Sequence, residues 1–256
     1  MALKFSFVNG ERLSPFPKGK GSCPVCGNDT HAKCGNVKIW HWAHGSNKIC
    51  DNWWENETAW HRAWKGYWSD SNQEIVHFNE LTGEKHIADV KNDDGLIIEM
   101  QNSPISQEEL ISRELFYGNM IWIVNAEKFK KNIYIGAKLP DPDNEVSKDM
   151  CIYPMQKASQ EFIYYRKSEH EPDVTLVELH GSHRIQSFID FSHIGHYLFI
   201  WAKPRSVWFH SKKSVYFDFG ENILWKLVKF NKYSPLCLRA FSKQYVINLY
   251  GGKINT

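Results

Sequence analysis

The sequence has no long uninterrupted run of apolar residues. A membrane-spanning helix needs about 18 of them in succession, and polar or charged side chains interrupt every stretch before that length is reached. The opening residues, Met1–Phe7, also lack the apolar core and small-residue cleavage site of a secretion signal. We therefore expect a cytoplasmic protein that does not contact the membrane.

A strong charge of one sign is also missing from the chain as a whole, because 31 Lys and Arg stand against 29 Asp and Glu. The distribution is nevertheless uneven. Residues 201–256 carry ten basic and two acidic side chains, whereas residues 141–180 carry four basic and nine acidic ones. Aromatic residues are interleaved with the basic excess over 197–250. This segment is expected to be either a DNA-binding flank or a solvated basic face over an aromatic core.

Cysteine is scarce outside one short segment, since four of the six cysteines lie between Cys23 and Cys50. In a chain without a secretion signal, such clustering favours a metal over disulfides. Cys23 and Cys26 have the CxxC spacing that lets two thiolates share one tetrahedral Zn²⁺. A structural zinc site is therefore predicted, the alternative being that some of these residues are small buried side chains.

The remaining zinc ligands must come from a second part of the same segment. His41 and His44 are the natural pair, because the gap from Cys26 to His41 is close to a common zinc-module spacing. Cys34 and Cys50 compete for the same two places. The predicted set is therefore two cysteines and two histidines, with the exact ligands left open.

A helix is predicted over residues 53–68, where four tryptophans recur at helical intervals. Within it, Glu57, His61 and Lys65 are spaced four apart and would lie on one stripe. In an isolated helix, such a stripe is usually a solvated network of ion pairs. Its meaning depends on the elements that follow.

Three strands and two turns are predicted next. The strands cover 74–78, 85–90 and 96–101, and the turns cover 81–84 and 92–95. Asp89 and Glu99 then fall at nearly opposite positions on adjacent antiparallel strands. Alternation places Gln101 on the same face as Glu99.

A second helix is predicted over 106–117, because Ser106 and Glu109 have the spacing of a capping box and Pro104 ends the preceding strand. The apolar run 120–124 has the form of a strand that is covered on both faces. The predicted order is helix, three strands, helix, strand.

The chemistry of this segment depends on the two opposed carboxylates. Asp89 and Glu99 offer the hard oxygen ligands that Mg²⁺ prefers, and Mg²⁺ activates water and neutralises charge during attack on a phosphate. Two acids beside a hairpin are, however, commonly just solubilising charges on a sheet edge. The order of the surrounding elements favours the metal site.

That order, with Glu57 on the first helix and Asp89 and Glu99-Met100-Gln101 on the strands, resembles the PD-(D/E)XK nuclease superfamily. More closely, several motifs in residues 20–130 are similar to the competence protein CoiA-like family. They are Cys23-x2-Cys26, His41-Trp42-Ala43-His44, residues 85–90 and residues 98–106, continued by 108–113, Phe116-Tyr117 and 122–124.

The resemblance implies an α/β (α+β) protein whose restriction-endonuclease-like core has a mixed sheet flanked by helices, preceded by a zinc-finger-like knuckle and followed by an α/β extension. The corresponding domains would be residues 1–52, 53–130 and 131–256. A strand followed by a helix is predicted over 216–229 within the last of these, because residues 219–222 interrupt the pattern.

The resemblance also assigns roles to single residues. Asp89 and Glu99 would bind Mg²⁺ or Mn²⁺, Gln101 would orient the attacking water or the phosphate, and Glu57 would act on the metal through water. His61, Lys65 and His86 become candidates for phosphate contact. The superfamily has Lys where Gln101 stands, and Gln carries no charge, so the missing cation would come from Lys65, Lys85 or His86.

The leading hypothesis is a metal-dependent nuclease, an endodeoxyribonuclease-like hydrolase that processes DNA in competence and recombination or in defence against foreign DNA. Its partners would be DNA and recombination or DNA-uptake proteins. The alternatives are a DNA-binding accessory protein whose nuclease-like core does not cut, and a zinc-dependent module that recruits recombination proteins.

Overall fold

The structure is a computed structural model that describes residues 2–45, 50–53, 57–170 and 176–254. They divide into two compact units. Unit 1 is formed by Met1–Ile123, Phe209–Lys213 and Ile247–Thr256, and unit 2 by Val124–Trp208 and Ser214–Val246. The protein is of the α+β class, dominated by sheets with few helices. Within the described ranges, no helix combines the length and the apolar character that crossing a membrane requires.

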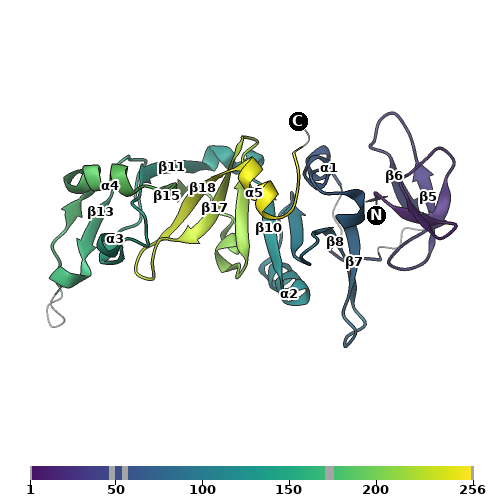
Figure 1. Cartoon of the computed structure of the whole chain (residues 1–256), viewed down its shortest axis with the longest axis horizontal. Coiled ribbons are helices and arrows are strands. Elements are labelled where there is room, and N and C mark those ends of the chain that lie inside the picture. The colour runs from purple at the N-terminus through teal and green to yellow at the C-terminus, as the bar shows by residue number, and fades with distance from the viewer. Residues whose placement is uncertain (1, 46–49, 54–56, 171–175, 255–256) are drawn as a thin grey trace. The chain divides into compact units, whose positions relative to one another are not determined.

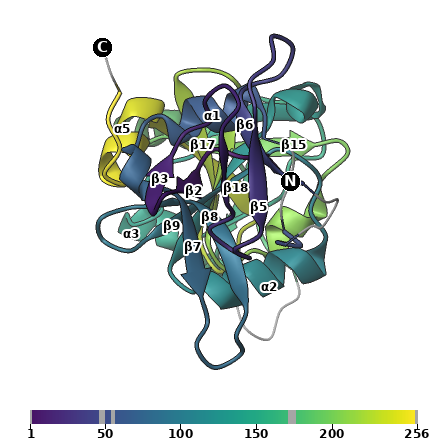
Figure 2. The same cartoon turned by 90° about the vertical axis from the view of Figure 1, so that its right-hand side faces the viewer.

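Unit 1 begins with a six-stranded antiparallel sheet of short strands in the order β1-β6-β5-β4-β2-β3 (Figures 1 and 2). The strands are β1 Ala2–Leu3, β2 Ser6–Val8, β3 Glu11–Leu13, β4 Lys20–Ser22, β5 Asp29–Lys33 and β6 His41–His44. Its small core is formed by Leu3, Cys23, Val25 and Trp42. The indole of Trp42 is fully buried and donates to the carbonyl of Leu13 at 2.9 Å, so this ring fixes the sheet from inside.

The first helix of unit 1, α1 (Ala59–Lys65), is shorter than the predicted helix 53–68. Thr58 caps it, because its hydroxyl accepts from the amide of His61 while the His61 ring accepts from the amide of Thr58. Of the tryptophans that suggested a longer helix, Trp53 instead stacks on His86. Residues 54–56 lie outside the described part of the chain. A complete cap at Thr58 therefore overrides the tryptophan periodicity.

The three predicted strands and the buried strand are confirmed. Unit 1 contains them in the order β10-β9-β8-β7. Their bounds are β7 Gln73–Phe78, β8 Lys85–Lys91, β9 Ile97–Gln101 and β10 Met120–Asn125. Both predicted turns have a glycine at positive φ, 73° at Gly83 and 79° at Gly95. Every residue of β9 and β10 is buried, as the apolar run at β10 predicted.

The predicted second helix is α2 (Gln107–Tyr117), which connects β9 to β10. Ser106 caps it as expected by accepting from the amide of Glu109 at 3.1 Å. The carboxylate of Glu109 does not complete a capping box, because it pairs with Arg113 one turn further along. The predicted order of helix, three strands, helix and strand is therefore confirmed.

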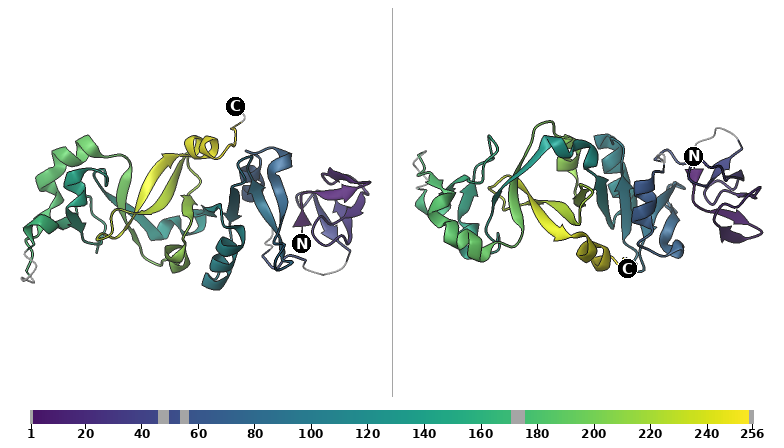
Figure 3. Two further views of the ribbon diagram at one scale, coloured as in Figure 1. Left: turned by 60° about the horizontal axis from the view of Figure 1, so that its bottom comes forward. Right: turned by 90° about the horizontal axis from the view of Figure 1, so that it is seen from above.

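Unit 2 contains five antiparallel strands in the order β11-β15-β18-β17-β16 and a separate three-stranded sheet, β12-β13-β14 (Figure 3). The strands are β11 Ile133–Lys138, β12 Met150–Ile152, β13 Ile163–Arg166, β14 His180–Gly181, β15 His196–Trp201, β16 Ser214–Asp218, β17 Ile223–Lys229 and β18 Leu236–Ser242. The α-helices after β10 are α3 Glu145–Lys148, α4 Gln186–Ser192 and α5 Lys243–Leu249. Within the described ranges, the 3₁₀ segments are η1 Asp70–Asn72, which precedes β7 in unit 1, and η2 Glu127–Asn132, η3 Lys167–Glu169, η4 Ser182–Ile185 and η5 Ser206–His210.

The prediction of a strand followed by a helix over 216–229 is wrong in its second half. Residues 219–222 turn a hairpin, with Gly220 at a φ of 79°, and β17 follows as a second strand. β17 pairs with β18 along its whole length and with β16 over residues 224–227. Strand pairing on both sides decides the conformation of a segment whose apolar residues fit either structure.

Candidate functional site

Four metal-ligating side chains come together at the N-terminal sheet. Cys23, Cys26, His44 and Cys50 place their ligand atoms within 4.8 Å of one another. The Sγ atoms of Cys23 and Cys50 are 3.7 Å apart, and His44 Nε2 lies 3.3 Å from Cys26 Sγ and 3.6 Å from Cys50 Sγ. A tetrahedral ion with Zn–S bonds of about 2.3 Å separates its sulfur ligands by roughly 3.8 Å. The group can therefore bind a metal such as zinc.

Hydrogen bonds from neighbouring amides favour the metal-binding form of two of these sulfurs, those of Cys23 and Cys26. Gly27, at a φ of 71°, closes a tight turn in which the Gly27 amide donates to the Cys23 carbonyl. Inside this turn the amide of Val25 donates to Cys23 Sγ at 3.4 Å, and the side-chain amide of Asn28 donates to Cys26 Sγ at 3.3 Å. Donors aimed at sulfur favour the thiolate form that binds metal.

The protonation of the cysteines supports the same interpretation. Burial, together with the neighbouring thiols, raises the pKa of Cys50 well above its ordinary value. Burial also raises the pKa of Cys23, whereas hydrogen bonds from the backbone and from neighbouring groups outweigh burial and lower the pKa of Cys26. Crowded thiols resist ionising together, and a divalent cation removes that resistance.

His41, one of the four predicted zinc ligands, and Cys34, one of the two competing candidates, lie outside this group. His41 and His44 are the first and last residues of β6, three apart, so alternation directs their side chains to opposite faces of the sheet. The His41 ring contacts the carbonyl of Ile39 at 2.8 Å. Cys34 follows β5 and lines a different, apolar depression. The structure thus brings together three of the four predicted ligands and the competing Cys50.

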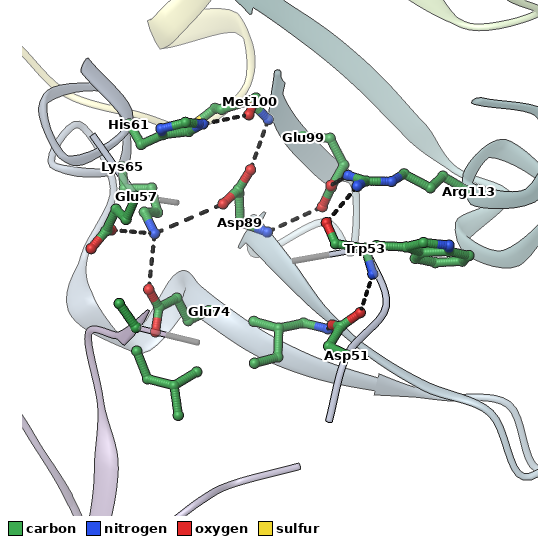
Figure 4. A pocket seen from close by; sticks show the side chains of 13 residues that line it. Asp51, Trp53, Glu57, His61, Lys65, Glu74, Asp89, Glu99, Met100 and Arg113 are labelled. Atoms are coloured by element: carbon green, nitrogen blue, oxygen red, sulfur yellow. Dashed lines mark hydrogen bonds and ion pairs between the residues drawn. The ribbon is translucent and has the colours of Figure 1, made fainter. Parts of the chain in front are cut away.

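A second constellation lies in a pocket of unit 1 (Figure 4). Asp89 on β8 and Glu99 on β9 are opposite residues, because Val90 pairs with Ile98 in this antiparallel ladder. The amide of Asp89 donates to Glu99 Oε1 at 3.1 Å, and the amide of Met100 donates to Asp89 Oδ2 at 2.9 Å. The convergence of the two carboxylates that the hairpin predicted is present.

Lys65 supplies a positive charge at these acids. Its Nζ atom is 2.6 Å from Glu57 Oε1, 2.9 Å from Glu74 Oε1 and 3.8 Å from Asp89 Oδ1 (Figure 4). Burial lowers the pKa of Lys65, but the surrounding carboxylates outweigh it and hold the pKa above its ordinary value. Lys65 is therefore a fixed cation inside the pocket. Glu57 precedes α1, yet its carboxylate reaches Lys65 as the predicted stripe required.

Glu99 is held from the other side by Arg113 of α2. Arg113 Nη1 donates to Glu99 Oε2 at 3.1 Å, and Nη2 donates to the carbonyl of Trp53. Burial, followed by the charge of Asp89, raises the pKa of Glu99 to about 8 despite this arginine. A cation that entered the pocket would therefore favour the ionised form of Glu99.

Sequence reasoning missed three charged residues that line the pocket, namely Asp51, Glu74 and Arg113. Arg113 could have been found, because it shares a helical face with Leu110 and Tyr117, and all three are buried. Asp51 accepts locally from the amide of Trp53, two residues along. It also accepts from His86 and from the amide of Ile87, and a local sequence pattern does not predict these long-range contacts.

Glu74 has an unusual backbone as well as a buried carboxylate. It adopts a φ of 47°, in the left-handed region that side chains with a Cβ avoid. One carboxylate oxygen contacts Lys65, and the other accepts from the amide of Lys4 at 2.8 Å. Glu74 therefore ties the N-terminal sheet to the pocket, and nothing in the sequence around it predicts this conformation.

The other predicted site residues are placed as follows. Gln101 is buried, and its amide nitrogen donates to the carbonyl of Ser103 at 3.1 Å. The ring of His61 lines the pocket, with Nε2 3.0 Å from the carbonyl of Met100. His86 lies between Asp51 and Glu84, at 2.8 Å from each. Lys85, the remaining candidate cation, packs over the ring of Phe78. Lys65 is thus the candidate cation that contacts Asp89.

A second depression, called the basic depression here because Lys38, His41 and Arg62 line it, shares Ala2 and Glu57 with this pocket. Its other lining residues are Lys38, Ile39, His41 and Arg62. Arg62 donates to Glu57 Oε2 at 2.6 Å and to the carbonyl of Trp40 at 2.8 Å. A basic approach to a cluster of carboxylates suits an anionic ligand.

Comparison with known proteins gave a match in the N-terminal part of the chain. Residues 15–52 match the family model described as "Competence protein CoiA, N-terminal domain". The matched segment contains all four members of the cysteine and histidine group. No curated protein and no solved structure matches the chain.

Proposed function

We propose that the protein is a metal-dependent DNA nuclease, with a PD-(D/E)XK-like core in residues 53–130. The observation that carries the proposal is the placement of Asp89 and Glu99 opposite each other on β8 and β9, with Lys65 3.8 Å from Asp89. This pair lies within the order α1, β7, β8, β9, α2, β10, the arrangement on which the resemblance to that superfamily rests.

The donors in the pocket suit a hard divalent cation. Its lining includes five carboxylates, against the two permanent cations Lys65 and Arg113. Burial, and after it the charge of Asp89, raises the pKa of Glu99 in this pocket. Mg²⁺ prefers carboxylate oxygens, so Asp89 and Glu99 would hold it. When bound, it would supply an activated water and neutralise charge on the phosphate under attack.

The side chains around this cation would have separate roles in the reaction. The carboxylate of Asp89 is 24% exposed and is the more accessible of the two ligands, whereas Arg113 holds Glu99 in a fixed orientation. Lys65 would supply the positive charge that the superfamily takes from the position of Gln101. Because Lys65 is fixed by Glu57 and Glu74, it would stabilise developing negative charge without first having to reorganise.

The basic depression beside the pocket would guide the DNA strand. Lys38, His41 and Arg62 line it, and the ring of Trp40 next to them is 44% exposed. Cations would contact phosphates and an exposed indole could stack on a base. The match of the preceding segment to a competence-protein domain supports a role in DNA uptake or recombination, with the proposed zinc site holding this part of the unit in place.

Cleavage assays on the full chain test the proposal. Supercoiled, linear and single-stranded DNA would be incubated with Mg²⁺ or Mn²⁺ and with wild type, Asp89→Asn or Glu99→Gln. Asp94→Asn is the matched control, because Asp94 is an exposed acid in the turn of the same hairpin. We expect a loss of about 10²–10³-fold in the first two variants and none in the control. Equal cleavage by all four proteins would overturn the assignment.

A non-cleaving DNA-binding accessory protein is the second candidate. It is favoured by Gln101, which stands where the superfamily has a lysine and donates to Ser103 rather than lining the pocket. Under this hypothesis, wild type would bind DNA through the basic depression but leave it intact with either metal. Binding that is weakened by Lys38→Met, without any cleavage, would decide for it.

A further inference from the structure

Unit 2 contains a row of basic and aromatic side chains across four neighbouring strands. His196 of β15 pairs with Arg239 of β18, Arg239 pairs with Lys226 of β17, and Lys226 pairs with Tyr216 of β16. Directly paired residues in an antiparallel sheet project from the same face. Two cations and a histidine are thus adjacent on one face of this sheet.

This arrangement is unfavourable for the protein alone. Lys226 and Arg239 occupy directly opposed positions, where like charges repel each other. Both side chains are only partly exposed. Burial, and then the charge of Arg239, lower the pKa of Lys226. Among the described residues, no carboxylate forms an ion pair with Lys226 or Arg239. Asp141 and Asp143 act on the pKa of His196 and form no ion pair with either cation.

The row also contains buried polar atoms without partners. Arg239 Nε and His196 Nδ1 are both buried and make no hydrogen bond with the described residues. An unpaired buried donor costs about 1–3 kcal/mol, and Arg239 Nε can only donate. The cations contact rings instead, with Lys226 over Tyr216 at 5.4 Å and Arg239 over Phe241 at 4.8 Å. The missing group is an acceptor that carries negative charge.

We propose that Lys226 and Arg239, with His196 beside them, bind a phosphate group, and that this phosphate belongs to the backbone of a nucleic-acid strand. Several features of the row suit such a ligand. A guanidinium and an ammonium side by side satisfy phosphate oxygens, which carry full charge and accept several hydrogen bonds. The ring of Phe241 stacks at 8° on that of Tyr245, which is 52% exposed and offers a base a flat surface. The site is separate from the acidic pocket and does not depend on cleavage.

Thermal unfolding of the full chain tests the anion site. Inorganic phosphate would be compared with chloride at equal ionic strength, for wild type, Lys226→Met and Arg239→Met. Lys229→Met is the matched control, since Lys229 is an exposed lysine of the same strand, three residues from Lys226 and hence on the opposite face. We expect phosphate to raise the Tm of wild type and of the control but not that of the other two variants. In chloride, Lys226→Met should unfold at a higher temperature than wild type, because the repulsion is gone.

Binding of a labelled single-stranded oligonucleotide without added Mg²⁺ separates the two sources of phosphate. For Lys226→Met/Arg239→Met we expect affinity to fall roughly tenfold, and the slope of log K against log salt to decrease by about 0.7, which corresponds to the loss of one phosphate contact on a single strand. Unchanged oligonucleotide binding with a lost phosphate effect on Tm would overturn the strand assignment and leave a site for free phosphate. A wild-type Tm that is the same in phosphate and chloride would overturn the site itself.

Discussion

The ammonium group of Lys65 lies 3.8 Å from the carboxylate of Asp89, although the two residues belong to a helix and to a strand that are separated in sequence by β7. The same ammonium is within 2.9 Å of Glu57 and Glu74. One buried cation thus neutralises carboxylates from three parts of unit 1. Both the stability of this unit and the proposed chemistry depend on it.

Removal of this cation should affect folding and cleavage together. Lys65→Met leaves Glu74 buried without its ion-pair partner and leaves Glu57 paired with Arg62 alone. Loss of one partner of a buried ion pair costs about 3–5 kcal/mol. We expect a lower free energy of unfolding by urea denaturation, and cleavage reduced by about 10²-fold at a temperature where the variant is folded. Lys65→Arg retains the charge and should recover most of the stability. If Lys65→Met cleaves like wild type, Lys65 has no part in the reaction.

Gln101 should matter much less than Lys65. Its side chain donates to Ser103 and does not line the pocket, so Gln101→Ala is expected to change the cleavage rate by less than about tenfold. Rates would be measured beside Lys65→Met under the same conditions. A folded Gln101→Ala protein that has lost cleavage entirely would show that Gln101 is essential for the reaction.

Zinc content should discriminate among the cysteines and histidines. Cys50→Ser and His44→Ala are expected to lose bound zinc, measured by elemental analysis of the purified protein, because both residues belong to the group of four. Cys34→Ser and His41→Ala are the matched controls and should retain it. Zinc retained by Cys50→Ser but lost from His41→Ala would restore the ligand set that the spacing favoured.

His196 should make the stability of the chain depend on pH. Burial, and then the charge of Arg239, lower its pKa from 6.5 to about 4. The unfolded chain therefore binds a proton in this interval that the folded chain does not. The stabilising contribution is complete above pH 6.5 and is lost as the pH falls from 6.5 to about 4, with a slope of at most about 1.4 kcal/mol per pH unit.

Urea denaturation of His196→Gln across this range is the measurement, with His210→Gln as the control because His210 is exposed. The unfolding free energy of His196→Gln should vary less with pH than that of wild type, while the control should follow wild type. Parallel profiles for all three proteins would show that His196 does not carry the dependence.

Local patterns were sufficient for part of this fold. The cap at Ser106 predicted α2. Alternation and glycine at turns predicted the hairpin of β8 and β9 and the opposition of Asp89 to Glu99. Each of these features depends on residues close in sequence. The limits of α1 were not predicted, since the cap at Thr58 was overlooked. β17 was mistaken for a helix because its strand pairing with β16 and β18 depends on tertiary context.

For the candidate sites, too, local motifs were predicted and tertiary contacts were not. The cysteine pair and the hairpin acids were visible as motifs. The choice of Cys50 over His41 depended on β6 being a strand, which places His41 and His44 on opposite faces. Asp51 is held in the pocket by contacts with His86 and Ile87. Glu74 is held there by contacts with Lys4 and Lys65. The spacing of residues in the sequence does not predict such contacts.

The direct succession of Cys50 and Asp51 has a consequence for regulation. Cys50 belongs to the proposed zinc ligands, whereas Asp51 lines the acidic pocket and accepts from the amides of Ile87 and Trp53. A single peptide bond therefore links the two centres mechanically. An oxidant that converts the cysteine thiolates to disulfides would release zinc, loosen Asp51 and alter the pocket without touching it. In that case, the oxidation state of these cysteines would set the geometry of the acidic pocket.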